Sequence, residues 1–190
     1  MEKELWKAGN MLYPLPAAMV SCREGDKKNI VTVAWTGTIC TNPPMLSISL
    51  KPERYSHGMI ERTGEFVLNL TTKSLVFACD YCGVKSGRDV DKFKETGLTA
   101  LPADFVGAPL IAESPVNIEC SVKEIIRLGS HDMFLANVLG VHVSKEYMSP
   151  EGKFELSQAE PVVYSHGAYY GLGELLGSFG YSVRKKGREK

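Results

Sequence analysis

The sequence predicts a mainly β fold with short helices, in which a mostly antiparallel sheet closes into a barrel. Its apolar runs are short and rich in β-branched residues, and turn-rich segments separate them. That spacing is typical of antiparallel barrels rather than of helical bundles or βαβ units. The predicted strands are Pro16–Cys22, Ile30–Trp35, Met45–Leu50, Phe66–Leu70, Val116–Cys120, Met133–Val143 and Pro161–Tyr164.

Two of these strands alternate small or polar residues with aliphatic ones. Thr32 and Ala34 alternate with aliphatic residues in the first, and Ser47 and Ser49 do so in the second. Successive side chains of a strand point to opposite faces of the sheet. We therefore expect one face of each strand to pack the core and the other to be free for solvent or a ligand.

Capping residues and glycines predict three short helices between the strands. The first is capped by Ser56 and ends near Gly64, and the second follows Thr71 and Thr72. The third is capped by Asp89. The second and third are predicted over Lys73–Cys82 and Asp89–Thr96, the last closed by Gly97.

Length and charge point to one globular domain over residues 1–190. The chain has 44% hydrophobic and 23% charged residues, which is ordinary globular composition. Lys and Arg together number 22, as do Asp and Glu, so no net field attracts nucleic acid or an anionic membrane. Four glycines between residues 171 and 180 predict a loose helix or a tail that docks on a partner. The basic run from Arg184 to Lys190 is interpreted as its solvated end.

The chain shows no long apolar segment, and its first residues are not a basic stretch followed by an apolar one, as in a signal peptide. We therefore expect a cytoplasmic protein without a membrane span. Five cysteines then favour reduced thiols. Cys79 and Cys82 form a CxxC pair, which we interpret as packing thiols, with a redox pair or half a zinc site as alternatives. Four histidines are scattered without metal-ligand spacing, so no metal site is expected.

Hydroxyls and cations crowd the end of one predicted strand and the start of the next helix. A phosphate monoester needs such donors, with a guanidinium to pair with its oxygens and a helix N-terminus to oppose its charge. An exposed polar hairpin end is the competing interpretation. The residues concerned are Ser47, Ser49, Lys51, Arg54, Tyr55 and Ser56.

Aromatic side chains lie close to these donors in the sequence. Trp35 and Tyr55 offer flat surfaces of the kind that wall a planar ring, although a Trp in a strand is more often a core residue. Lys92 follows a Gly turn and an Asp cap; it can place a cation beside an electron-rich ring, and solvated surface is the alternative. His131 follows a turn into a long strand, where side chains commonly reach ligands.

Taken together, five segments resemble the flavin reductase-like, FMN-binding split-barrel family. They are the run from Asn29 to Thr38, the Asn-Pro-Pro-Met turn at residues 42–45, Lys51 to Ser56, Gly64 to Asn69, and Ser86 to Phe93. The likeness extends from about residue 10 to about residue 170, and the last segment is the most specific.

The resemblance implies a Greek-key split barrel that forms a homodimer and binds FMN near the subunit interface. Asn29, Trp35, Ser56, Lys92 and His131 fall at positions where the family contacts the flavin or its phosphate. Tyr164 falls at an aromatic contact, where we expected phenylalanine. The segments on the phosphate side contribute Thr36, Gly37, Ser49, Lys51, Arg54 and Tyr55. Lys92 and His131 are the residues expected to act on the flavin, Lys92 by stabilising its anionic reduced form.

The family is divided in function, and so is the expectation. The first hypothesis is an electron-transfer flavoprotein that keeps FMN bound non-covalently and receives electrons from a redox partner protein. The enzyme alternative is an NAD(P)H-dependent flavin or ferric reductase. A third is a non-catalytic binding module without a cofactor.

Overall fold

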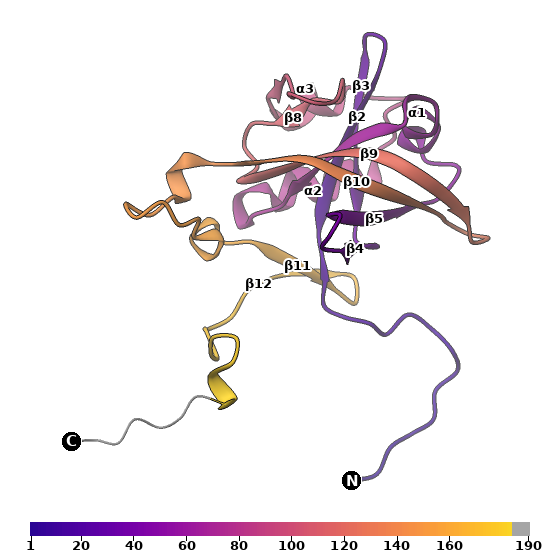
Figure 1. Ribbon diagram of the computed structural model, residues 1–190. Coiled ribbons are helices and arrows are strands. Elements are labelled where there is room, and N and C mark those ends of the chain that lie inside the picture. Colours follow the sequence, from indigo (N-terminus) through magenta and orange to yellow (C-terminus); the bar gives the residue numbers. More distant parts are fainter. Residues whose placement is uncertain (184–190) are drawn as a thin grey trace.

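A computed structural model describes residues 1–183, and its main feature is one antiparallel sheet of seven strands (Figure 1). The strand order is β3-β2-β6-β9-β10-β5-β4, in which the pairs β2 with β6 and β10 with β5 bring together strands distant in the sequence. The mainly β fold expected from the sequence is confirmed. The strands of this sheet are β2 (Ala18–Glu24), β3 (Lys27–Val33), β4 (Thr36–Cys40), β5 (Met45–Leu50), β6 (Glu65–Leu70), β9 (Val116–Arg127) and β10 (Asp132–Val143).

The main core lies on the inner face of this curled sheet. Phe66, Phe134 and Ile48 are completely buried there, and Met59 and Ile60 of helix α1 (Tyr55–Thr63) pack against them. On β5 the aliphatic residues are buried and both serines are half-buried, as the alternation predicted. Burial of these apolar side chains, each contributing roughly 1.5–3 kcal/mol, holds α1 against the strands.

A second core lies on the outer side of β2 and β3, under helices α2 (Val76–Val84) and α3 (Lys92–Thr96). It corrects one expectation, because the polar face of β3 is not free. Thr32 donates a hydrogen bond to the carbonyl of Cys79, and its side chain lies against Gly83 of α2. Helix α2 therefore covers this face and leaves no ligand site there.

Two smaller sheets complete the structure. One joins β1 (Leu15–Pro16), β11 (Val162–Ser165) and β12 (Ala168–Gly171), and the other joins β7 (Ala100–Leu101) and β8 (Leu110–Ile111). Strands β7, β8 and β12 were not predicted. Single turns of 3-10 helix span Lys73–Leu75, Lys145–Tyr147, Leu156–Ala159 and Tyr181–Val183.

The three predicted helices exist, but two of the predicted caps are wrong. Helix α1 begins at Tyr55 with Arg54 at its N-cap position, so Ser56 lies inside the first turn and is buried. Asp91, rather than Asp89, caps α3 by accepting a hydrogen bond from the backbone of Lys94. Gly97 ends that helix with φ of 68°, a conformation that favours glycine.

Residues 172–178 have no regular secondary structure, so the loose helix is not formed there, and docking of this tail on a partner stays a prediction. The basic run at 184–190 lies outside the described residues. Cys79 and Cys82 are both buried in the second core as free thiols. Within residues 1–183, no helix has the length and apolar character needed to span a bilayer.

Candidate functional site

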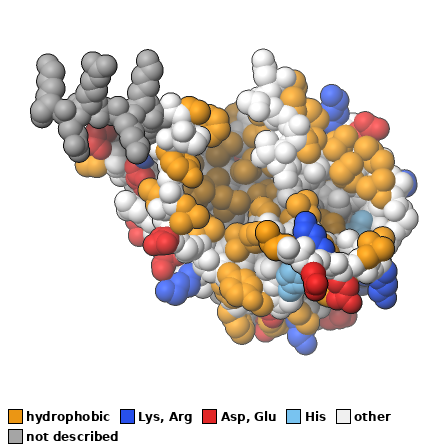
Figure 2. Space-filling model, turned by 90° about the horizontal axis from the view of Figure 1, so that it is seen from below, with side chains coloured by type: hydrophobic (Ala, Val, Ile, Leu, Met, Phe, Trp, Pro, Cys, Tyr) orange, Lys and Arg blue, Asp and Glu red, His pale blue; other side chains and the backbone are white. Residues whose placement is uncertain are grey.

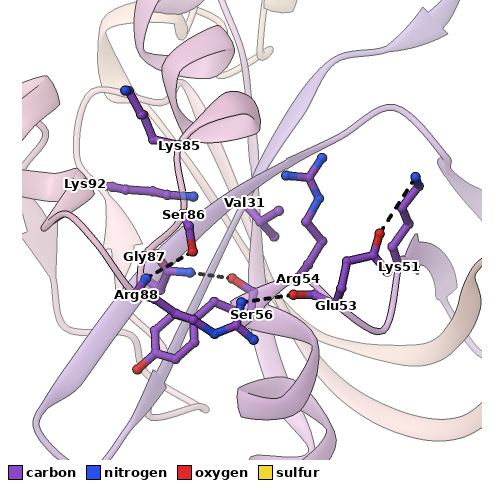
Figure 3. A pocket seen from close by; sticks show the side chains of 12 residues that line it. Val31, Lys51, Glu53, Arg54, Ser56, Lys85, Ser86, Gly87, Arg88 and Lys92 are labelled. Carbon is purple, nitrogen blue, oxygen red and sulfur yellow. Dashed lines mark hydrogen bonds and ion pairs between the residues drawn. The ribbon is translucent and has the colours of Figure 1, made fainter.

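A polar pocket of about 260 Å³ lies where β3, the start of α1 and the loop after α2 converge (Figure 3). We call it the phosphate pocket because its donors suit a phosphate group. Its lining combines three segments of the chain that are far apart in the sequence. The residues are Asn29, Val31, Lys51, Glu53, Arg54, Tyr55, Ser56, Lys85, Ser86, Gly87, Arg88 and Lys92.

The N-terminus of α1 supplies free backbone donors to this pocket. Arg54 occupies the N-cap position in an extended conformation, and its side chain makes no capping hydrogen bond. In the described chain, the N–H groups of Tyr55 and Ser56 donate to no acceptor. Unsatisfied N–H groups and the helix dipole together favour an anion at such a place.

Asn29 and Gly87 shape the pocket wall. The Asn29 side chain donates a 2.8 Å hydrogen bond from Nδ2 to Oγ of Ser56 and thus joins β3 to α1. Gly87 lies so close that a Cβ atom there would be 2.2 Å from Oδ1 of Asn29. A residue without a side chain is therefore required for the loop to approach Asn29.

The pocket is strongly cationic. Five basic side chains line it, against the single carboxylate of Glu53. The Arg54 guanidinium donates to the carbonyl of Gly83 at 2.9 Å, and Lys51 pairs with Glu53 at 3.8 Å. A phosphate monoester carries close to two negative charges and three acceptor oxygens, so this set of donors fits it.

Lys92 is the most unusual of these cations because it is buried, with only 4% of its surface exposed. Its Nζ donates to the carbonyls of Ile30 and Cys82 at 2.6 and 2.7 Å (Figure 3 shows its side chain extending into the pocket region). Burial, the largest influence, lowers the pKa of Lys92 to about 8. Among residues 1–183 no carboxylate forms an ion pair with it. A buried charge without a partner is costly, and an anion in the pocket would compensate it.

A second hollow, of about 480 Å³, lies beside Trp35 and contains other residues expected to contact the cofactor. Thr36, Gly37 and Ser49 line it, and residues 9–13 of the N-terminal segment form its opposite wall. The Trp35 indole is 38% exposed and stacks against the His131 imidazole, with centroids 6.1 Å apart and ring planes 5° from parallel. We call this hollow the ring hollow. Trp35 is thus not a core residue.

The two hollows divide the predicted residues between them. Six of them line the phosphate pocket: Asn29, Lys51, Arg54, Tyr55, Ser56 and Lys92. Four others line the ring hollow: Trp35, Thr36, Gly37 and Ser49. His131 does not line the ring hollow itself but stacks on Trp35, which does. Tyr164 lies on β11, opposite Leu15 and 6.2 Å from the Tyr13 ring, and lines neither hollow.

Sequence reasoning missed four polar members of the phosphate pocket: Glu53, Lys85, Ser86 and Arg88. From the segment Ser86 to Phe93, whose resemblance to the family is the most specific, only Lys92 is predicted to contact the flavin. The available signal was Gly87 between two basic residues, because a glycine there allows a close backbone approach. Ser86 closes the turn by accepting a hydrogen bond from the backbone of Arg88 at 3.2 Å.

Elsewhere, Glu119, His142 and Asp104 come close enough together to resemble a metal centre. The buried Glu119 carboxylate, however, already accepts three backbone N–H groups from residues 104–106 and contacts Nε2 of His142 at 2.6 Å. Burial opposes ionisation, but these hydrogen bonds dominate and lower the pKa of Glu119. Its oxygens are thus occupied in anchoring the loop before β8.

The chain belongs to the flavin reductase-like family, whose domain model matches residues 10–173. This confirms the family resemblance seen in the sequence. Flavoredoxin of Desulfovibrio vulgaris (Miyazaki F) has a similar solved structure, with 30% identity and a TM-score of 0.89. The alignment covers 97% of this chain and all of the flavoredoxin, which supports the split-barrel fold.

Two relatives extend the comparison. A protein of Aeropyrum pernix is 28% identical over 155 residues; the match covers 81% of this chain but only 58% of that relative's length. An NADH-dependent FMN reductase of Streptomyces nodosus subsp. asukaensis is 24% identical over 159 residues, covering 83% of this chain and 78% of the reductase. The proteins similar to this chain thus include one named as a flavoredoxin and one named as an FMN reductase.

Proposed function

We propose that this protein binds FMN non-covalently and acts as an electron-transfer protein of the flavoredoxin type. The observation that carries the proposal is Lys92, a buried ammonium group without a carboxylate partner in the wall of a cationic pocket at a helix N-terminus. The FMN phosphate accepts hydrogen bonds there from the backbone of α1 and from the side chains of Arg54 and Ser56. Asn29 holds Ser56 in place.

Strand β5 connects the phosphate pocket to the ring hollow. Ser49 lines the ring hollow, Lys51 lines the phosphate pocket, and the backbone N–H of Ser49 donates to the carbonyl of Trp35 at 2.8 Å. A molecule with a planar ring at one end and a phosphate at the other matches this arrangement. The isoalloxazine ring, when bound, accepts and gives up electrons. Trp35 and His131 pack beside it and exclude water.

A second candidate is an NAD(P)H-dependent flavin or ferric reductase, supported by the relative named as an NADH-dependent FMN reductase. The open ring hollow favours it as well, because its volume of about 480 Å³ and the exposure of Trp35 leave room for a second planar ring. In that case a reduced nicotinamide would bind in the ring hollow and transfer a hydride to the flavin, leaving the oxidised nicotinamide.

We further propose that the protein works as a homodimer. The face that carries both terminal segments has hydrophobic side chains gathered around a hollow (Figure 2). Leu175 and Leu176 of the C-terminal segment line this hollow and are 88% and 84% exposed. Exposed apolar clusters of this kind mark association surfaces. The expected mass in sedimentation experiments is twice that of one chain.

Anaerobic spectroscopy tests the proposed function. The purified protein should be yellow with a flavin spectrum, should not be bleached quickly by NADH or NADPH, and should be reduced by a ferredoxin or hydrogenase system. Rapid bleaching by a nicotinamide, with turnover of added FMN, would favour the reductase. A colourless protein that takes up no FMN in equilibrium dialysis would favour a binding module and refute both.

A further inference from the structure

The phosphate pocket adjoins a larger outer groove of about 660 Å³, and Arg88 lies between them. The phosphate pocket and the outer groove share only Tyr55, Gly87 and Arg88 as lining residues. The groove is otherwise formed by the β2–β3 hairpin at residues 26–28 and by residues 89–91. The residues between the pocket and the groove therefore determine whether a compound bound by its phosphate can extend into the groove.

The Arg88 side chain crosses from one wall of the pocket to the other. Its backbone belongs to the turn begun by Ser86, and its Nη1 donates to the carbonyl of Glu53 at 3.1 Å (Figure 3). The guanidinium lies over the Tyr55 ring, 5.4 Å from its centroid. A hydrogen bond and a cation–π contact thus hold this bridge across the mouth that leads to the groove.

The groove shares no lining residue with the ring hollow. In the proposed binding mode the cofactor reaches the pocket along β5, past Ser49 and Lys51, whereas Arg88 and Tyr55 line both the pocket and the groove. FMN ends at its single phosphate, but FAD continues from that position through a second phosphate to an adenosine. Its additional half must therefore pass the place that Arg88 occupies.

The charges beyond the bridge are less favourable to a second phosphate. The phosphate pocket has five basic side chains and one carboxylate, but the groove has three carboxylates, Asp26, Asp89 and Asp91, against Lys27, Lys28 and Arg88. Lys28 is also turned toward the Phe93 ring, 4.9 Å from its centroid. A second phosphate would lose its hydration there without gaining a cationic cradle.

We propose that Arg88 is the residue that determines cofactor specificity, and that it restricts the site to a flavin monophosphate. The inference rests on the proposed FMN function and adds to it the selection of FMN over FAD. Arg88 contributes a cation to the single phosphate and closes the route to the groove.

Flavin-fluorescence titrations of the full-length, flavin-depleted protein with FMN and with FAD test this proposal. The native protein should bind FMN at least about 30-fold more tightly than FAD. Arg88→Ala should weaken FMN binding by about tenfold, the loss of one charge-assisted hydrogen bond. It should leave FAD binding unchanged or improve it, so the FAD/FMN ratio of dissociation constants falls at least about tenfold.

Arg54→Ala is the matched control, because Arg54 lines the phosphate pocket but not the groove. It should weaken both flavins by the same factor and leave their ratio unchanged. Arg88→Met, which keeps much of the side-chain bulk without the charge, should weaken FMN but still disfavour FAD. Equal affinity of the native protein for both flavins, or the same ratio in Arg88→Ala as in the native protein, would overturn the role of Arg88 while leaving FMN binding intact. A native protein that binds neither flavin would refute the proposed function itself.

Discussion

The amide of Asn29 and the hydroxyl of Ser56 are joined by a hydrogen bond of 2.8 Å, although 27 residues separate them in the sequence. Both side chains are almost completely buried. The bond ties β3 to the first turn of α1 at the point where the helix presents its free N–H groups. The shape of the phosphate pocket therefore depends on this contact and on the loop that packs against it.

Replacing Gly87 should damage the pocket without unfolding the protein. A Cβ atom at this position would come within 2.2 Å of Asn29, so Gly87→Ala forces either the Asn29 side chain or the loop to move. We expect FMN affinity to fall at least about tenfold, since a displaced donor set loses charge-assisted hydrogen bonds. Gly171→Ala is the control, because a Cβ there meets no atom within 4 Å. Equal FMN affinity in both variants, measured by titration, would contradict the predicted role of the close approach.

FMN binding should weaken as pH rises through the pKa of Lys92. Because that pKa is lowered to about 8, the ammonium loses its proton between about pH 7 and 9, whereas the FMN phosphate stays doubly charged above about pH 6. The expected loss of affinity from pH 7 to pH 9.5 is about tenfold, the contribution of one charge-assisted hydrogen bond. Titrations across this range measure it.

Lys92→Met provides the comparison for that pH dependence. This variant should bind FMN more weakly at pH 7 and show little change up to pH 9.5. Lys94→Met removes an exposed lysine from the same helix and should keep the native pH dependence. If Lys92→Met and the native protein lose affinity in parallel, another group is responsible for the titration.

The stacked pair of Trp35 and His131 should contribute affinity for the ring rather than for the phosphate. Trp35→Ala should weaken FMN and riboflavin by the same factor, about tenfold or more, because stacking of a base on an aromatic side chain contributes about 1–3 kcal/mol. Trp35→Phe should recover part of the loss, and Trp6→Ala, which removes the other indole at a 70% exposed position, should change neither affinity. A loss confined to FMN would show that Trp35 acts on the phosphate end instead.

Glu119 should contribute to stability and not to flavin binding. A glutamine at this position would turn an amide NH2 toward backbone N–H donors of residues 104–106, so Glu119→Gln should lower the free energy of unfolding by about 2–4 kcal/mol. Glu65→Gln is the control, since Glu65 accepts only the N–H of Gly107 from the same loop and should cost about 1 kcal/mol or less. Urea denaturation of the flavin-free proteins compares the two.

The role of Glu119 in stability should also appear in the pH dependence of unfolding. Because the folded state lowers the pKa of Glu119 below 4.5, its contribution is complete above about pH 4.5 and is lost as pH falls through the folded-state value. The native protein should therefore lose stability in acid more steeply than Glu119→Gln does. Identical slopes below pH 4.5 would mean that other carboxylates dominate acid unfolding.

Local patterns predicted the strands well because alternation reports burial directly. Ser47 and Ser49 line up on the open face of β5, as their spacing indicates. The same reasoning failed for Thr32, because a helix from elsewhere in the chain covers that face of β3. Periodicity shows that a face is polar, but it does not reveal what packs on it.

Contacts across long sequence separations could not be derived from spacing at all. Trp35 and His131 are 96 positions apart and meet only because β5 pairs with both β4 and β10. The choice of Asp89 over Asp91 as a helix cap failed for a different reason. Both acids suit the cap position, and the turn begun by Ser86 places the helix start two residues later.

The affinity of the flavin-depleted protein for FMN relative to riboflavin tests the phosphate pocket most directly, because the two ligands differ only in the phosphate. Two charge-assisted hydrogen bonds to the phosphate suffice for a difference of at least about 100-fold in favour of FMN. We predict that difference at pH 7. Equal dissociation constants for FMN and riboflavin would contradict the assignment of the cationic pocket at α1.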